Sequence, residues 1–257
     1  LWHARRNIEM VVGILFRDVL GVDLRLIFTA AAERPRTKLT HSLLRKMDHI
    51  VAVTPQCAAY MNHACSIIPH GIDIEKFSPA LLKASQSEGV NSPLEGGSFA
   101  TAPYQSNQYM LGCFGRIRPK KGTHILIDVL LDLLPHYPNW SAIFLGYTAP
   151  KHQQYKANLV KKIAAAGLTE RITFIGESKT MVEWYRRIAV YVSPSLSEGF
   201  GLTLLEAMAC GKPIIASDVG IARQLAKANA VGHIVAPGHT ASLKKALEFF
   251  LLSLIHI

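Results

Sequence analysis

Residues 197–213 read SEGFGLTLLEAMACGKP and lie between two short apolar runs, Val190–Val192 and Ile214–Ala216. The apolar runs predict buried strands, and the segment between them predicts a helix over Leu202–Cys210 that ends at Gly211. A strand, a glycine-rich turn, a helix and a second strand form the repeating unit of a parallel sheet with crossover helices. Backbone N–H groups at such a turn can reach a phosphate or a sugar.

The same alternation extends in both directions along the chain. Toward the C-terminal part it predicts strands at Tyr109–Phe114, Ser141–Leu145, Ile172–Ile175 and His233–Val235. The helices predicted between and after them are Thr123–Leu134, Tyr155–Ala166, Met181–Ile188 and Ser242–Phe250. Ser242 is the predicted cap of the last helix. Toward the start it predicts helices at Ile8–Leu20, Lys38–Met47 and Pro55–Met61, and strands at Leu24–Thr29, Ile50–Val53 and Ser66–Ile68. The sequence therefore predicts an α/β fold with two Rossmann-like domains, of which the first is incomplete.

Composition sets the predicted boundaries. Ser, Gly, Pro, Asn and Gln dominate residues 81–108, which indicates a linker or long loop between a partial domain at 1–80 and a fuller one at 109–251. The chain opens at Leu1 without a methionine, and residues 252–257 resemble a translated sequencing adapter, so we expect both ends to be cut.

The net charge of +10 favours polyanionic or phosphate-bearing partners. The basic residues form no long run, and neither zinc-finger spacing nor an aromatic RNA-binding pattern is present, which argues against nucleic acid. The four cysteines form no CxxC pair, so we expect buried, reduced thiols in a cytoplasmic protein. The sequence contains no apolar run of about 20 residues that would cross a bilayer.

Glu198 lies on the glycine-rich turn, eight positions before Glu206 on the predicted helix. Carboxylates of this kind suit the paired hydroxyls of ribose or hexose. For an isolated Glu-x₇-Glu pair, a loop charge and a helix-surface charge would be the ordinary interpretation. The whole segment, however, closely resembles the Glu-x₇-Glu block of retaining nucleotide-sugar glycosyltransferases of the family-four type, which have the GT-B fold of two domains facing across a cleft.

The resemblance implies roles for individual residues. Glu198 would face the donor sugar, Glu206 would hold the nucleotide ribose, and the backbone from Gly199 through Phe200 and Gly201 to the helix start at Leu202 would contact sugar or phosphate. In a second segment, four residues separate Gly115-Arg116 from Lys121-Gly122, which matches the family's Gly-Arg-x₄-Lys-Gly pattern. The resemblance implies that Arg116 and Lys121 bind the donor diphosphate. Because the sequence has no Asp-x-Asp metal motif, these fixed cations would neutralise the leaving group, and we expect neither a metal nor another cofactor.

Three further segments show weaker likeness to the family. Residues 68–77 resemble the segment that closes the first domain. The tripeptide Gly176-Glu177-Ser178 stands where the family has its base-binding loop. Residues 2–7 and 28–34 resemble a subgroup that adds mannose to the lipopolysaccharide core, which would place His3 and Arg5 at the cleft. A lone histidine, however, is more often structural than catalytic.

The chain also departs from the family pattern. Many relatives have a cleft histidine where this chain has Ala31, and their Gly-Gly-x-Pro-Glu turn is replaced by residues 219–223. Both changes affect the donor-sugar environment and leave the sugar open.

The resemblance implies transfer of a hexose from a nucleoside-diphosphate sugar, with GDP-mannose preferred, to a saccharide or lipid-linked acceptor with retention of configuration. We expect the chain as it stands to be inactive alone. The alternatives are a non-catalytic nucleotide-binding module, or a glycogen-phosphorylase-like enzyme, which would need a pyridoxal-phosphate lysine and a longer chain. Arg36, Lys38, Arg45 and Lys46 would suit peripheral docking at an anionic inner-membrane surface, although a solvated helix face explains them equally well.

Overall fold

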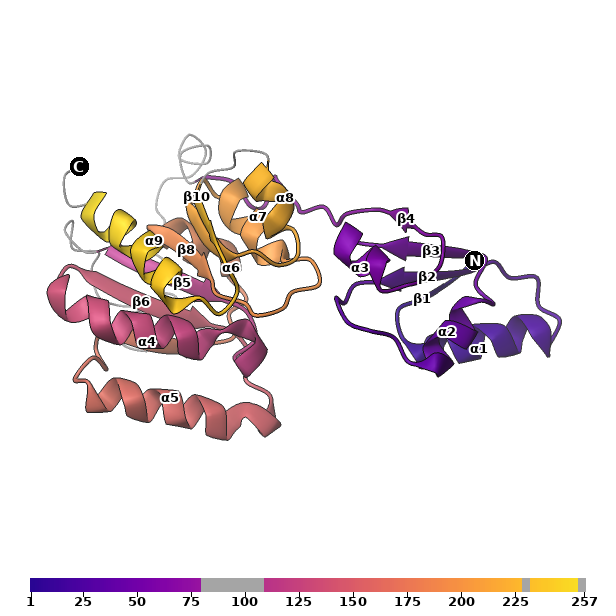
Figure 1. Cartoon of the computed structure of the whole chain (residues 1–257), viewed down its shortest axis with the longest axis horizontal. Helices are drawn as coiled ribbons and strands as arrows, with labels where there is room; N and C mark the ends of the chain where they lie inside the picture. Colours follow the sequence, from indigo (N-terminus) through magenta and orange to yellow (C-terminus); the bar gives the residue numbers. More distant parts are fainter. Residues whose placement is uncertain (80–108, 228–231, 254–257) are drawn as a thin grey trace. The chain divides into compact units, whose positions relative to one another are not determined.

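The computed structural model describes residues 1–79, 109–227 and 232–253 (Figure 1). The chain forms two compact units, one made of Leu1–Gly71 with Ser197–Gly201, the other of Ile72–Leu196 with Leu202–Ile257. The residues expected to form the linker, 81–108, and residues 254–257 of the expected tail lie outside the described part of the chain.

The first unit contains a parallel sheet in the order β1 (Trp2–Ala4), β2 (Leu26–Ala30), β3 (His49–Ala52) and β4 (Ser66–Ile67). Its helices are α1 (Asn7–Asp18), α2 (Lys38–Leu44) and α3 (Pro55–Ala59). The core combines apolar side chains from the sheet and the helices: Ala4, Met10, Phe28, Ala30, Leu44, Ile50 and Met61.

Local chemistry explains where these helices begin. Thr37 and Thr54 each stand before a helix with extended backbone, and their hydroxyls accept bonds from the N–H groups of Thr40 and Cys57. At α1 the Glu9 carboxylate accepts from the Arg5 and Arg6 N–H groups, which lowers the pKa of Glu9.

The second unit contains a six-stranded parallel sheet in the order β10–β9–β8–β5–β6–β7. The strands are β5 (Tyr109–Phe114), β6 (Trp140–Leu145), β7 (Ile172–Gly176), β8 (Val190–Ser193), β9 (Ile214–Ser217) and β10 (Gly232–Val235). The strand order reverses between β5 and β8, which are neighbours in the sheet although about 80 residues separate them in sequence. In open α/β sheets, ligands bind at the carboxyl ends of the strands beside such a reversal.

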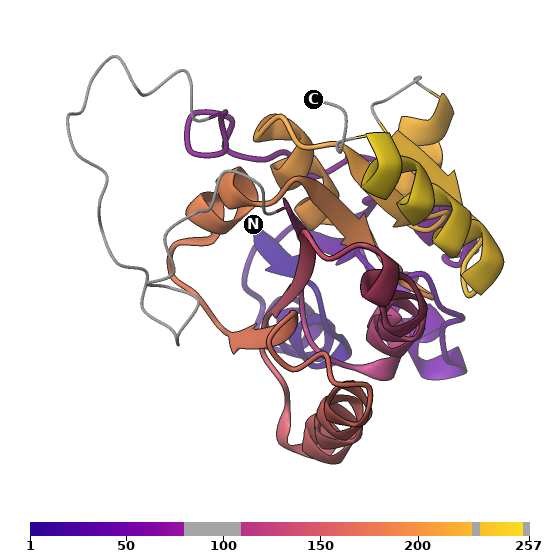
Figure 2. The same cartoon turned by 90° about the vertical axis from the view of Figure 1, so that its left-hand side faces the viewer.

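Helices cover both faces of this sheet. They are α4 (Thr123–Leu133), α5 (Gln153–Ala165), α6 (Met181–Arg187), α7 (Leu202–Ala209), α8 (Ala222–Lys227) and α9 (Thr240–Ser253). Helix α4 lies between α5 and α9, as Figures 1 and 2 both show. The large side chains of the core, among them Trp140, Phe144 and Leu130, are almost completely buried. The predicted α/β class with parallel sheets is confirmed.

Several local predictions were wrong. The sequence did not predict the strand at Trp2–Ala4, which is too short to show a period, or the helix α8 at residues 222–227. Ser242 is not the cap of the last helix, because α9 begins at Thr240 and the Ser242 N–H donates to the His239 imidazole (3.1 Å). Helix α2 ends at Leu44, so Arg45 and Lys46 follow it and Arg36 precedes it. All four cysteines are free thiols, but Cys65 and Cys113 are only partly buried.

Candidate functional site

The Gly-Arg-x₄-Lys-Gly motif lies at the carboxyl end of β5. Gly115 has φ +136°, and a Cβ there would lie 3.7 Å from the Lys121 Nζ, so the Lys121 side chain passes over this glycine. A 3₁₀ turn, η3 (Pro119–Lys121), leads to Gly122, which has φ +67° and stands before α4. The lysine therefore reaches back toward the strand end where its motif begins.

The β5 motif is in direct contact with the segment that follows β8. A Cβ at Gly122 would lie 1.8 Å from the Pro194 carbonyl oxygen, so only glycine permits this approach. The Leu196 N–H donates to the Lys120 carbonyl oxygen (2.9 Å). A small cavity between the two segments is lined by Gly115, Arg116 and Lys121 on one side and by Ser193, Pro194 and Ser195 on the other. The two loops thus meet at the strand-order reversal.

The Cys113 thiol lines the same cavity. Burial raises the pKa of Cys113 to about 12, and the nearby Lys121 ammonium acts in the opposite direction. The thiol is therefore neutral at physiological pH, and the charge at this strand end comes from the motif's cations.

Arg116 is exposed and also lines a second pocket, of about 110 Å³. Arg118, Tyr147, Lys151 and His152 lie around the same pocket. No sequence pattern singled out these neighbours of Arg116, although Arg118 stands inside the Gly-Arg-x₄-Lys-Gly motif and Lys151 and His152 follow a strand. The basic side chains of Arg116, Arg118 and Lys151 around one pocket favour an anionic group.

Glu206 lies on α7 and is half-buried. Its Oε2 accepts a hydrogen bond from the Tyr185 hydroxyl on α6 (2.7 Å). Tyr185 is completely buried, and its pKa lies well above the ordinary value because of burial and the neighbouring Tyr191 and Glu206. The structure thus gives Glu206 a neutral buried donor that no sequence pattern indicated.

The Ser197–Gly201 turn belongs to the first compact unit, whereas Arg116, Lys121 and Glu206 belong to the second. Phe200 is buried, and its ring meets His70 edge-on at 5.0 Å between centroids. A Cβ at Gly199 would lie 1.9 Å from the Ala31 carbonyl oxygen, and Gly201 has φ +101°. Packing and backbone conformation therefore account for both glycines. Glu198 is partly buried, and Leu202, the first residue of α7, is exposed.

The remaining candidates, His3, Arg5 and residues 176–178, lie on or directly after strands β1 and β7. His3 is exposed on β1, with its Nε2 2.7 Å from the Thr29 hydroxyl, and the exposed Arg5 follows the strand. Gly176 ends β7 with φ +89° and is followed by the exposed Glu177. The Ser178 hydroxyl accepts bonds from the Thr180 N–H and the Trp184 indole, so it stabilises its own turn.

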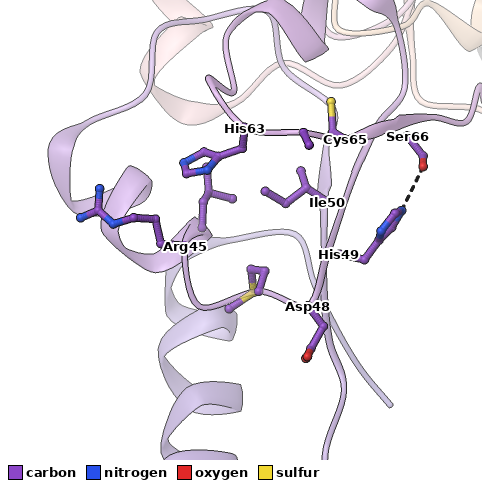
Figure 3. Close-up of a pocket in the computed structure, with 10 residues that line it drawn as sticks. Arg45, Asp48, His49, Ile50, His63, Cys65 and Ser66 are labelled. Carbon is purple, nitrogen blue, oxygen red and sulfur yellow. Dashed lines mark hydrogen bonds between the residues drawn. The ribbon is translucent and has the colours of Figure 1, made fainter.

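A larger pocket, of about 540 Å³, lies in the first unit at the amino ends of β3 and β4 (Figure 3). His49 and Ser66, 3.1 Å apart, lie on one side of it, with His63 and Cys65 nearby. None of the sequence-predicted site residues lines it. Volume alone therefore does not mark the candidate site.

Within the described residues, no group of three or more His, Cys, Asp or Glu side chains is placed to hold a metal ion. In the same part of the chain, helices that combine the length and the apolar character required to cross a membrane are absent.

Comparison with known families decides the assignment. The family model for glycosyl transferases group 1 matches residues 99–253, which include both motifs. The chain belongs to this family. The motifs at 115–122 and 198–206 lie in the matched region.

Two curated relatives of this glycosyl transferase are lipopolysaccharide core biosynthesis mannosyltransferases. LpsB of Rhizobium meliloti is 39% identical over 88% of this chain and 61% of its own length. LpcC of Rhizobium leguminosarum is 37% identical over 96% of this chain and 66% of its own length. The chain therefore spans less than two thirds of either relative.

Solved structures show the same fold. HepE of Anabaena, solved with UDP and glucose, superposes with a TM-score of 0.80 at 22% identity, over 98% of this chain and 68% of its own. The C-terminal domain of LpcC from Francisella tularensis gives a TM-score of 0.57 at 31% identity, over 70% of this chain and 88% of its own. The predicted glycosyltransferase of GT-B fold class is thereby confirmed.

Proposed function

We propose that the second unit of this glycosyl transferase binds a nucleoside-diphosphate hexose, and that the whole enzyme transfers the hexose to a hydroxyl of a saccharide or lipid-linked acceptor. In this reaction the acceptor oxygen bonds to the anomeric carbon while the bond from that carbon to the diphosphate oxygen breaks. The proton of the acceptor hydroxyl passes to the departing diphosphate or to solvent, and the nucleoside diphosphate leaves. The charge that develops on the diphosphate must be stabilised.

The observation that carries this proposal is the arrangement at the strand-order reversal. Arg116 and Lys121 follow β5 and line a small cavity together with the segment after β8, and Glu206 lies on the helix that comes next. Fixed cations suit a diphosphate, and a carboxylate suits a ribose diol. Arg118 and Lys151 around the neighbouring pocket add positive potential at the same edge of the sheet.

We further propose mannose as the sugar, GDP-mannose as the donor and retention of configuration. The names of LpsB and LpcC support the mannose and an acceptor in the lipopolysaccharide core. The Glu-x₇-Glu resemblance supports retention. We propose that Glu198 faces the donor sugar, while His3, Arg5 and the 176–178 tripeptide remain weaker candidates.

Calorimetric titration with GDP, UDP and ADP tests the proposal. We expect selective GDP binding, and we expect Glu206→Ala to weaken it roughly tenfold to a hundredfold because a pair of charged hydrogen bonds is lost.

Lys121→Ala should weaken the binding of GDP more than the binding of GMP, because only GDP carries the second phosphate. Lys244→Ala is the control, since this cation is exposed and pairs with Asp132 on α4. Equal losses for GDP and GMP would contradict the diphosphate role of Lys121.

The same titration separates the enzyme from a non-catalytic nucleotide-binding module only in combination with a transfer assay. A folded chain that binds no nucleotide would remove both interpretations. Nucleotide binding without hexose transfer, in a protein of the relatives' full length, would favour the non-catalytic module.

We also propose peripheral contact with an anionic membrane, on a different surface from the one that the sequence indicated. Lys46 pairs with Asp18 (3.1 Å) and Arg36 is half-buried, so fewer of the predicted basic side chains are available to meet an anionic surface. Helix α1 instead exposes Ile8, Val11, Leu15 and the adjoining Val19 at helical spacing. Arg5 and Arg6, both exposed, stand at its start.

Vesicle co-sedimentation tests this contact. We expect binding to phosphatidylglycerol vesicles that weakens with salt and is lost in the double variant Ile8→Ser, Leu15→Ser. The control Phe249→Ser alters an exposed apolar residue on α9. Equal binding of the control and the double variant would contradict the α1 surface.

A further inference from the structure

Tyr185 lies at the centre of a buried aromatic cluster in the second unit. Its ring meets Phe114 at 4.9 Å, Tyr191 at 5.7 Å and Phe77 at 5.9 Å between centroids. The side chain is 0% exposed. Packing on this scale fixes the ring, so the position of the hydroxyl is fixed as well.

The fixed hydroxyl donates to Glu206 Oε2 at 2.7 Å across the α6–α7 contact. A hydroxyl-to-carboxylate bond of this length is charge-assisted and directional. An ionised carboxylate has about four lone-pair positions, and the tyrosine occupies one of them. The bond therefore restricts the rotation of the Glu206 carboxylate and leaves acceptor positions for a ligand.

The protonation state of the tyrosine supports this arrangement. Burial and the negative charge of Glu206 hold the pKa of Tyr185 well above its ordinary value. Tyr185 therefore remains a neutral donor throughout the physiological range. A longer, rotatable donor would not restrict the carboxylate in the same way.

We infer that Tyr185 is a positioning residue for nucleotide recognition, which orients the Glu206 carboxylate toward the two ribose hydroxyls. This inference rests on the proposed role of Glu206 in holding the ribose. The ordinary alternative is a core tyrosine whose hydroxyl is satisfied by the nearest acceptor. The two interpretations differ in what removal of the hydroxyl does to ribose discrimination.

The test measures dissociation constants for GDP and 2′,3′-dideoxy-GDP by calorimetry on the full chain, with UDP and dideoxy-UDP in parallel. The ratio of the dideoxy to the ribose constant is the ribose discrimination. We expect a ratio of roughly ten to a hundred for the unmodified chain, from one or two charged hydrogen bonds. In Tyr185→Phe the ratio should fall about threefold to tenfold through weaker GDP binding, with the dideoxy constant unchanged.

Tyr191→Phe is the matched control. It also removes a buried tyrosine hydroxyl, one that donates to the Phe114 carbonyl oxygen (3.1 Å). We expect it to leave the discrimination ratio as in the unmodified chain. Thermal unfolding by circular dichroism checks that both variants are folded.

Glu206→Ala separates the failure of this inference from failure of the proposed function. If Glu206→Ala leaves the ribose discrimination unchanged, or if the folded chain binds no nucleotide, the positioning role of Tyr185 and the proposed function are both contradicted. If Glu206→Ala brings the ratio to about one while Tyr185→Phe changes nothing, only the positioning role is overturned. Equal weakening of both nucleotides by Tyr185→Phe overturns it too.

The double variant Tyr185→Phe, Glu206→Ala completes a double-mutant cycle with the two single variants and the unmodified chain. We expect it to show the same ratio as Glu206→Ala alone, because a positioning residue has no effect once its partner is removed. Weaker GDP binding by the double variant than by Glu206→Ala alone would show that Tyr185 acts independently of Glu206. Should Tyr185→Phe fail to fold, Glu206→Gln replaces it: the amide still accepts from Tyr185, and so should keep more discrimination than alanine.

Discussion

At the residue scale, Gly122 decides whether the β5 loop can approach the segment after β8. Its φ is +67°, and a Cβ would lie 1.8 Å from the Pro194 carbonyl oxygen. Gly122→Ala therefore adds both backbone strain and a backbone clash. We expect the free energy of unfolding to fall by about 3 kcal/mol or more, measured by urea denaturation. Nucleotide affinity should fall too, because Lys121 is the adjacent residue.

Gly167 is the matched control for Gly122. It has nearly the same φ, +71°, but a Cβ there would meet no atom within 4 Å. Gly167→Ala should cost only the left-handed backbone strain, about 1–2 kcal/mol, and should not change nucleotide affinity. Similar losses of stability in the two variants would mean that the Pro194 contact contributes nothing.

At the element scale, Arg171 connects the end of α4 with β6 and the start of β7. Its guanidinium donates to the carbonyl oxygens of Leu134 (2.7 Å), Trp140 and Tyr137. Arg171→Lys removes the planar fork and leaves some of these carbonyls without a donor. We expect a loss of about 2 kcal/mol or more in the free energy of unfolding.

The comparison for Arg171 is an exposed ion pair on the same face of the sheet. Lys162 and Asp128 connect α5 with α4, with side chains that are 51% and 45% exposed. Lys162→Met should change the free energy of unfolding by less than about 1 kcal/mol. A loss for Lys162→Met as large as that for Arg171→Lys would show that exposed charges, not carbonyl capping, connect these elements.

The elements also show what a sequence can predict. Strands β5 to β10 were all located from their apolar runs, and β5 exactly matches its predicted bounds, because buried parallel strands have a strong local pattern. Strand β1 has three residues, too few for any period. The His239 cap of α9 escaped because an imidazole is an unusual acceptor for a helix N–H.

Only the part of the candidate site that stands in local motifs could be predicted from the sequence. Arg116, Lys121 and Glu206 stand in local motifs, so the sequence alone could name them as candidates. Tyr185 lies 21 positions from Glu206, on an ordinary amphipathic helix, and its role depends on how α6 packs against α7. Such a contact between distant positions leaves no spacing to recognise.

At the scale of the whole molecule, the two units each have a core of their own, so a ligand bound by one of them need not stabilise the other. We expect GDP at about a hundred times its dissociation constant to stabilise the second unit by about 2.7 kcal/mol. Amide hydrogen exchange should then slow roughly a hundredfold in the core strands β5, β6 and β8. Strands β2 and β3 of the first unit should exchange at an unchanged rate, and Glu206→Ala at the same GDP concentration should reduce the effect. Equal slowing in both units would show that the nucleotide is not held by the second unit alone, and the assignment of Arg116, Lys121 and Glu206 as a sufficient nucleotide site would then fall.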